Sequence, residues 1–152
     1  MTINTSHLFF SFKNATCDKN QGEECLKILH NVMEYSCHDI RYKILNYRTL
    51  NTYDTFLHLL ASNYIMTPVI EKLLQLGADP DVYNSSNNIP LHCAVKNECV
   101  NNVALFLRRS KNINAQDNYK NTALHYNANH PNKIITQLLL NAGSFYDIPN
   151  FD

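Results

Sequence analysis

The sequence predicts an all-α protein: a solenoid of stacked helix pairs with protruding turns, about four repeats long. The prediction rests on three markers that share one period. A Leu-His pair recurs about every 33 residues, ending at His58, His92 and His125. Two glycines that follow apolar helical stretches, Gly77 and Gly143, are separated by twice that period. The third marker keeps the same spacing: Asp81, Asn114 and Asp147.

Each repeat is expected to begin with a short first helix. Thr55 and Thr122, with Ile89 at the equivalent position, stand at its start, where a hydroxyl can cap exposed N–H groups. The leucine that follows enters the core, and the histidine after it can bridge backbone groups of adjacent turns. The segments that connect one repeat to the next, residues 79–88 and 112–121, are rich in Asn, Asp and Ser, which suits a protruding turn.

A second helix follows in each repeat, with its apolar residues at helical spacing. The residues expected to face the core are Val69, Ile70, Leu73 and Leu74, then Val103, Phe106 and Leu107, then Ile134, Ile135, Leu138 and Leu139. Gly77 and Gly143 supply the left-handed residue that ends such a helix. Ser110 stands where the other repeats have glycine, so that turn is expected to be strained or to close differently.

Two further departures concern spacing and packing. The interval from His58 to His92 is longer by a single residue than the next one, and that residue falls in "ASNYIMTPVIEK" (61–72), between the two helices of that repeat. Asn127 and Leu60 occupy a position where a small alanine would let neighbouring helix pairs approach closely. Both side chains are expected to change how tightly the repeats stack.

The words "TFLH", "IPLH" and "TALH", on a period of about 33 residues, resemble the T-P-L-H-x-A signature of ankyrin repeats. The resemblance is strong over residues 44–147 and weaker before them. It implies one ankyrin-repeat domain over residues 1–152. We expect an irregular N-terminal capping repeat (1–46), three repeats (47–80, 81–113 and 114–147) and a short tail (148–152).

"ILNYRTLNTYDTFLHLL" (44–60) and "GADPDVYNSSNNIPLHCAV" (77–95) also resemble the junctions between early repeats of the IκB family, inhibitors of NF-κB. The chain lacks the Asp-Ser-Gly degradation signal and the acidic tail of the cellular inhibitors. Its Asn- and Tyr-rich composition is similar to that of short ankyrin proteins of poxviruses and polydnaviruses, although AT-rich bacterial and protist genomes give similar compositions. The resemblance implies a pathogen protein that binds and modulates a host protein.

The composition restricts the classes of partner. Thirteen basic and 13 acidic residues leave no net charge, so neither nucleic acid nor an anionic membrane is indicated as a partner. No apolar run approaches the roughly 18 residues of a membrane helix, and the N-terminal apolar cluster lacks the preceding basic residue of a secretory signal. Five cysteines without a C-x-x-C pair favour free thiols. We expect a cytoplasmic or nuclear protein in a host cell.

Residues that could carry chemistry do not converge in the sequence, so we expect neither an enzyme nor a cofactor. His58, His92 and His125 recur one per helix pair, which indicates a structural role, as the repeat itself does for Gly77 and Gly143. A Cys/His metal site is the less favoured alternative. It would need partners from elsewhere in the chain for its candidate ligands, Cys17, Cys25, Cys37, His30 and His38.

Protein binding remains the expected function, because exposed residues on the turn tips and first helices line the concave face of this architecture. The candidate partner-binding residues are Arg48, Tyr53, Leu59, Tyr83, Asn84, Ser85, Asn87, Lys96, Gln116, Asp117, Tyr119, Lys120, Tyr126 and His130. The IκB resemblance implies a Rel-homology transcription factor as the partner. Two alternatives remain: an adaptor that recruits host ubiquitin-ligase machinery, and self-association through the apolar C-terminal repeat. Tip tyrosines can also simply pack on neighbouring tips.

Overall fold

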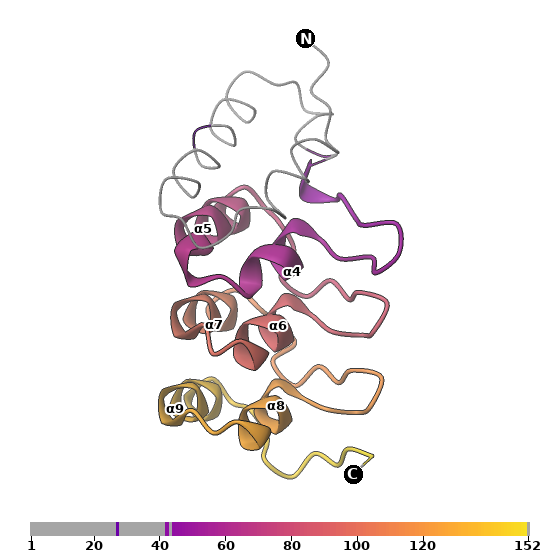
Figure 1. The fold of residues 1–152 in the computed structure, drawn as a ribbon. Helices are drawn as coiled ribbons and strands as arrows, with labels where there is room; N and C mark the ends of the chain where they lie inside the picture. The colour runs from indigo at the N-terminus through magenta and orange to yellow at the C-terminus, as the bar shows by residue number, and fades with distance from the viewer. Residues whose placement is uncertain (1–26, 28–41, 43, 152) are drawn as a thin grey trace.

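The computed structural model describes Lys27, Tyr42 and residues 44–151. Six α-helices and one 3-10 turn follow one another from Phe56 to Asn141, and the described residues contain no strand. They are α4 (Phe56–Ala61), η1 (Tyr64–Met66), α5 (Thr67–Gln75), α6 (Pro90–Lys96), α7 (Val100–Leu107), α8 (Ala123–Asn129) and α9 (Lys133–Asn141). The first helices α4, α6 and α8 stack in one column and α5, α7 and α9 in a second, with long turns projecting beside the first column (Figure 1). The predicted all-α solenoid is confirmed.

The predicted capping repeat (1–46) lies almost wholly outside the described residues. The same holds for the five candidate metal ligands Cys17, Cys25, Cys37, His30 and His38. The number of repeats before Tyr47 therefore stays a prediction.

The apolar residues of the second helices form part of the hydrophobic core. All four predicted residues of α5 are buried, as are Val103 and Phe106 of α7. In α9, Ile135 and Leu139 are fully buried, but the prediction was wrong for Ile134, which is 60% exposed. Ile134 follows the first residue of its helix and occupies the position of Pro68 and Asn101, which are exposed in their repeats. Whether a side chain is buried therefore depends more on its position in the repeat than on the local pattern of apolar residues.

The second helices end in two different ways. Gly77 and Gly143 have φ values of 95° and 94°, and the residue after each donates its N–H to a carbonyl five residues back, at 3.0 Å. Ser110 is absent from the residues with positive φ. Its hydroxyl donates to the carboxylate of Asp81, which also accepts the N–H of Lys111 at 2.8 Å. The expected different closure is thus confirmed, and it ties one repeat to the previous one.

Polar side chains fill the loop between helices where the spacing departs from the period. The extra residue of the first described repeat is accommodated by η1, whose N–H at Ile65 donates to the Asn63 side chain at 3.0 Å. Asn102 of the next repeat is fully buried and donates to the carbonyls of Ala61 and Asn63, both at 3.0 Å. The longer loop is therefore held by the neighbouring repeat.

Asn127, the side chain at the alanine position, links the two helices of its own repeat. Its amide donates to Thr136 Oγ1 at 2.7 Å, and its carbonyl oxygen accepts the N–H of Asn132 at 3.3 Å. Both polar ends are satisfied although the residue is only 4% exposed. The larger side chain is thus accommodated by hydrogen bonds between α8 and the start of α9.

Candidate functional site

The three inter-repeat turns share one backbone feature. Tyr53, Asn87 and Lys120 have φ values of 55°, 57° and 64°, a left-handed conformation that side chains other than glycine rarely adopt. They occupy equivalent positions in successive repeats, each two positions before the N-cap residue of a first helix. All three are exposed. Every tip therefore presents a side chain where glycine would be the least strained residue.

Hydrogen bonds join the tips to one another. Ser85 donates its N–H to the Thr52 carbonyl at 2.9 Å, and Asn118 donates its N–H to the Ser86 carbonyl at 3.1 Å. The Arg48 guanidinium also donates to the Tyr83 carbonyl at 3.1 Å. The tips therefore form a continuous ridge, and an exposed side chain on one tip is held in a defined position relative to the next.

Some of the predicted binding residues build this ridge. Asn84 accepts the N–H groups of Ser86 and Asn88, both at 3.0 Å. Asp117 accepts those of Tyr119 and Asn121, both at 2.8 Å, and is 3% exposed. These two side chains stand at equivalent positions and close their turns internally.

Two other predicted residues also make contacts within the ridge. The Gln116 amide donates to the carbonyls of Lys120 and Pro149, at 2.8 and 2.9 Å. The Tyr83 hydroxyl accepts the Asn112 amide at 2.5 Å, so part of this tyrosine packs on its neighbour.

The predicted residues with freely exposed side chains are therefore a smaller set, which we call the recognition face. It comprises Tyr53, Ser85, Asn87, Lys96, Tyr119, Lys120 and His130, with Arg48 and Tyr83 at its edge. Leu59 and Tyr126 lie half-buried on the first helices between the turns and the core. The charged side chains exposed on this face, those of Arg48, Lys96 and Lys120, are basic.

Contacts of Tyr126 with neighbouring side chains hold the part of the recognition face that lies on the first helices. The Tyr126 hydroxyl donates to Asp117 Oδ2 at 2.5 Å, and the Lys96 ammonium lies 5.8 Å from the centre of the Tyr126 ring. Burial, followed by the hydrogen bond to Asp117, raises the pKa of Tyr126. Burial also raises the pKa of the Cys93 thiol to about 11. Both groups stay protonated at neutral pH, which suits a binding surface and provides no nucleophile.

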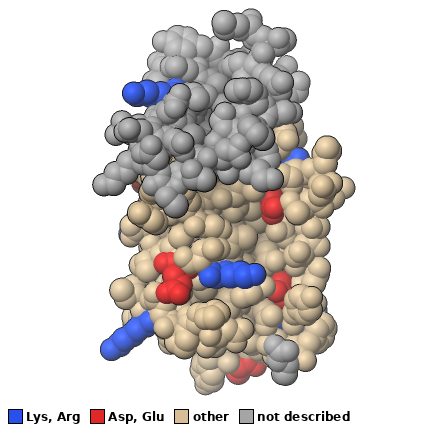
Figure 2. Space-filling model, in the orientation of Figure 1, with Lys and Arg blue, Asp and Glu red and all other residues tan. Residues whose placement is uncertain are grey.

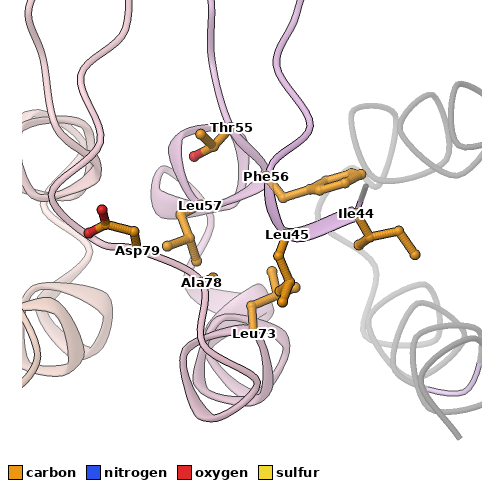
Figure 3. A pocket seen from close by; sticks show the side chains of 8 residues that line it. All are labelled: Ile44, Leu45, Thr55, Phe56, Leu57, Leu73, Ala78 and Asp79. Atoms are coloured by element: carbon orange, nitrogen blue, oxygen red, sulfur yellow. The ribbon is translucent and has the colours of Figure 1, made fainter. Parts of the chain in front are cut away.

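A cavity of about 10 Å³ lies beside the first described repeat. The side chains that line it, shown in Figure 3, are those of Ile44, Leu45, Thr55, Phe56, Leu57, Leu73, Ala78 and Asp79. It has room for about one water molecule and is a packing gap between residues 44–45 and the first described repeat. No group of three or more His, Cys, Asp or Glu side chains lies close enough to hold a metal ion in residues 44–151.

The periodic helix pairs and turns agree with the comparison to known families. Residues 57–150 match the family described as ankyrin repeats (3 copies). The chain belongs to the ankyrin-repeat family. Ankyrin repeats generally serve as non-enzymatic modules for protein–protein interaction, and their exposed turns and first helices are the surfaces described above.

Two curated ankyrin-repeat proteins are similar to this chain. One, from Acanthamoeba polyphaga mimivirus, is 35% identical over 79 residues, which cover 52% of this chain and 10% of the relative. The other, from Fowlpox virus (strain NVSL), is 32% identical over 82 residues, which cover 54% of this chain and 11% of the relative. This chain therefore aligns with about a tenth of the length of these viral relatives.

On the face shown in Figure 2, the ankyrin repeats present few charged side chains. Acidic and basic side chains are scattered among broad uncharged areas on the face shown in Figure 2. None of the helices in the described part of the chain is long and apolar enough to cross a membrane.

Sequence reasoning identified the tip residues but missed their backbone conformation. A signal was present: the positions two residues before Thr55, Ile89 and Thr122 keep the period and hold Tyr, Asn and Lys.

Proposed function

We propose that this ankyrin-repeat protein is a pathogen protein that binds and modulates a host protein through its recognition face. The observation that carries the proposal is the left-handed conformation of Tyr53 and Lys120, whose exposed side chains make no hydrogen bond in the described residues. A non-glycine residue in this conformation costs about 1–2 kcal/mol. Strain of this kind clusters at binding sites, where the side chain contributes to function. The viral relatives support a pathogen origin.

The specific partner that we propose is a Rel-homology transcription factor, which the IκB-like segments 44–60 and 77–95 favour. The exposed basic groups of the recognition face, Arg48, Lys96 and Lys120, would then meet carboxylates on the partner. Aromatic residues such as Tyr53 and Tyr119 are frequent binding hot spots.

A double substitution, Tyr53→Gly with Lys120→Gly, tests this proposal. It removes two exposed side chains and the strain of both turns, so we expect the variant to be more stable by about 1 kcal/mol. Its affinity for a purified Rel-homology domain should fall at least about tenfold. Calorimetric titration measures the affinity, and thermal unfolding measures the stability. Ile134→Ser, on the outer side of α9, is the control that should bind as the wild type does.

Unchanged binding by the glycine variant would show that the tips do not contact the partner. The adaptor alternative predicts a different result in host cells. There, the purified protein would bring down ubiquitin-ligase subunits and leave an NF-κB reporter unchanged. That outcome would eliminate the Rel partner.

Self-association through the C-terminal repeat is a second proposal, and one observation favours it. Phe145 and Tyr146, which follow Gly143, are 61% and 86% exposed. Exposed aromatic residues that adjoin one another mark interaction surfaces.

A further inference from the structure

One buried carboxylate joins a turn tip to a first helix. Asp117 is 3% exposed, and its Oδ1 accepts the N–H groups of Tyr119 and Asn121, both at 2.8 Å. These two bonds close the turn. The other oxygen, Oδ2, accepts the hydroxyl of Tyr126, a residue of α8, at 2.5 Å. Asp117 therefore fixes a side chain on the helix in addition to the backbone of its own turn.

The bond between this carboxylate and the α8 hydroxyl is not needed to build a repeat. The equivalent positions hold Asn84 with Cys93 in the previous repeat, and Leu50 with Leu59 in the repeat before it. The two leucines have no polar side-chain atom, and a thiol is only a weak hydrogen-bond donor. Both repeats nevertheless form the same projecting turn and helix pair (Figure 1). The bond is therefore a feature of one repeat that the fold does not require.

The residue type at position 117 explains why this repeat makes the bond. Asn84, at the equivalent position one repeat earlier, donates its side-chain amide to Asp54 Oδ1 in the preceding turn at 2.8 Å. Asn150, at the next equivalent position, donates in the same way to Asn121 Oδ1 at 2.8 Å. The carboxylate of Asp117 has no N–H to donate. Its second oxygen accepts a hydrogen bond from its own repeat instead.

The ring of Tyr126 lies against the previous repeat. The Lys96 ammonium, at the end of α6, lies over this ring at 5.8 Å from its centre. The buried ring of His92, also in α6, meets it edge-on, with the ring centres 5.8 Å apart and the planes at 74°. Because a cation is attracted to the face of an aromatic ring, the ring favours one position of the exposed ammonium. The contacts thus lead from Asp117 through Tyr126 to a side chain of the recognition face.

We propose that Asp117 and Tyr126 are positioning residues for Lys96 in binding the Rel-homology partner. Asp117 holds the hydroxyl of Tyr126, and the ring of Tyr126 holds the Lys96 ammonium where it meets a carboxylate of the partner. The inference rests on the partner binding proposed above and names the residues that prepare one of its contacts. Tyr126 acts from beneath Lys96, because it is half-buried and its hydroxyl proton is already donated to Asp117.

Such an arrangement raises affinity because the lysine is ordered before the partner binds. A long side chain that is free in the unbound protein loses conformational entropy when an interface immobilises it, and this loss weakens binding. A lysine held over a ring has lost part of that freedom already. The advantage of the Tyr126 hydroxyl should therefore exist only while Lys96 is present, which separates a positioning role from a merely structural one.

Tyr126→Phe tests the role, since it removes the hydroxyl and keeps the ring. Calorimetric titration with a purified Rel-homology domain should show an affinity at least about fivefold lower than that of the wild type. In a Lys96→Ala background, the same substitution should lower the affinity by less than about twofold, because the residue that it positions is absent. Tyr64→Phe is the matched control. It removes a hydroxyl from a tyrosine that is 64% exposed outside the recognition face, and it should bind as the wild type does.

Thermal unfolding of each variant verifies that it is folded at the temperature of the titration. An affinity that Tyr126→Phe leaves unchanged overturns the positioning role but retains the proposed partner. A loss of equal size with and without Lys96 also overturns it, because the hydroxyl would then act directly or through the fold. A wild-type protein that does not bind the domain overturns the Rel-homology partner and this role with it.

Discussion

At the residue scale, the Leu-His pairs that end at His58 and His92 each place one imidazole between two sets of backbone groups. Nδ1 of His58 accepts the N–H of Thr55 at 3.2 Å, so the proton lies on Nε2, which donates to the Asn88 carbonyl. His92 accepts the N–H of Ile89 at 3.1 Å in the same way, although Ile89 has no hydroxyl. The histidine therefore caps its helix without help from a threonine, and it also fastens the next turn.

His92→Ala should lower the free energy of unfolding by about 1–3 kcal/mol, because it leaves a buried N–H and a buried carbonyl unpaired. The same substitution at His125 should cost less, since His125 accepts the Thr122 N–H at 3.1 Å but bonds no following turn. Urea unfolding of both variants measures the difference. Equal losses would contradict the role of the Nε2 bond. Lost partner binding with full stability in His92→Ala would contradict a purely structural role.

At the element scale, the ends of the second helices depend on backbone conformation. Gly77 has a φ of 95° and no atom within 4 Å of where a Cβ would lie. Space is therefore available for a side chain, but the left-handed backbone disfavours one. The first helix α6 ends with the same kind of turn, where Glu98 has a φ of 53° and the residue after it, Cys99, donates its N–H to the Ala94 carbonyl at 3.0 Å.

Gly77→Ala should therefore lower the free energy of unfolding by about 1–2 kcal/mol through strain alone. Gln75→Ala, at an exposed position near the end of α5, is the control and should change it by less than about 0.5 kcal/mol. Chemical denaturation of the two variants provides the comparison. If Gly77→Ala left the free energy of unfolding unchanged, the turn would have adopted another conformation, as the turn at Ser110 does.

At the scale of the whole molecule, stability comes from interfaces between repeats, because no repeat can bury its apolar surface alone. His58 and His92 lie inside two of these interfaces. Burial lowers the pKa of both side chains, with the Asn88 and Ala115 carbonyls, Asp54 and Asp117 opposing that change and Arg48 adding to it at His58.

The unfolded chain therefore takes up protons on these histidines near pH 6.5, whereas the folded chain takes them up only at lower pH. The stability that they provide is fully present above about pH 6.5 and decreases as the pH falls below it. Each histidine should contribute a slope of up to about 1.4 kcal/mol per pH unit. Urea unfolding between pH 7.5 and 5.5 measures it. His92→Asn should reduce the slope; a slope that is the same in this variant and in the wild type would contradict this account.

The sequence by itself determined the architecture. The repeating Leu-His pairs, the regular spacing that they mark and the glycines at φ near 95° specify helix pairs that must stack. These features are local, because capping, helix termination and apolar spacing each depend on a few neighbouring residues. This architecture predicts that the turn tips and the first helices are exposed, and most of the predicted binding residues lie on them. Whether they bind a Rel-homology protein stays a prediction.

Only the tertiary structure decided which residues of these surfaces are free. Asp117 and Tyr119 are two residues apart in one polar turn, yet Asp117 is buried and holds the turn while Tyr119 is 70% exposed. Leu124 and Leu91 have the same place in the repeat, yet Leu91 is fully buried and Leu124 only partly buried. Burial and hydrogen bonding depend on the neighbours that the fold brings together, and Ala61 lies 41 residues before the Asn102 side chain that donates to its carbonyl. A local pattern does not contain that information, and for this reason the recognition face emerged only from the stacked repeats.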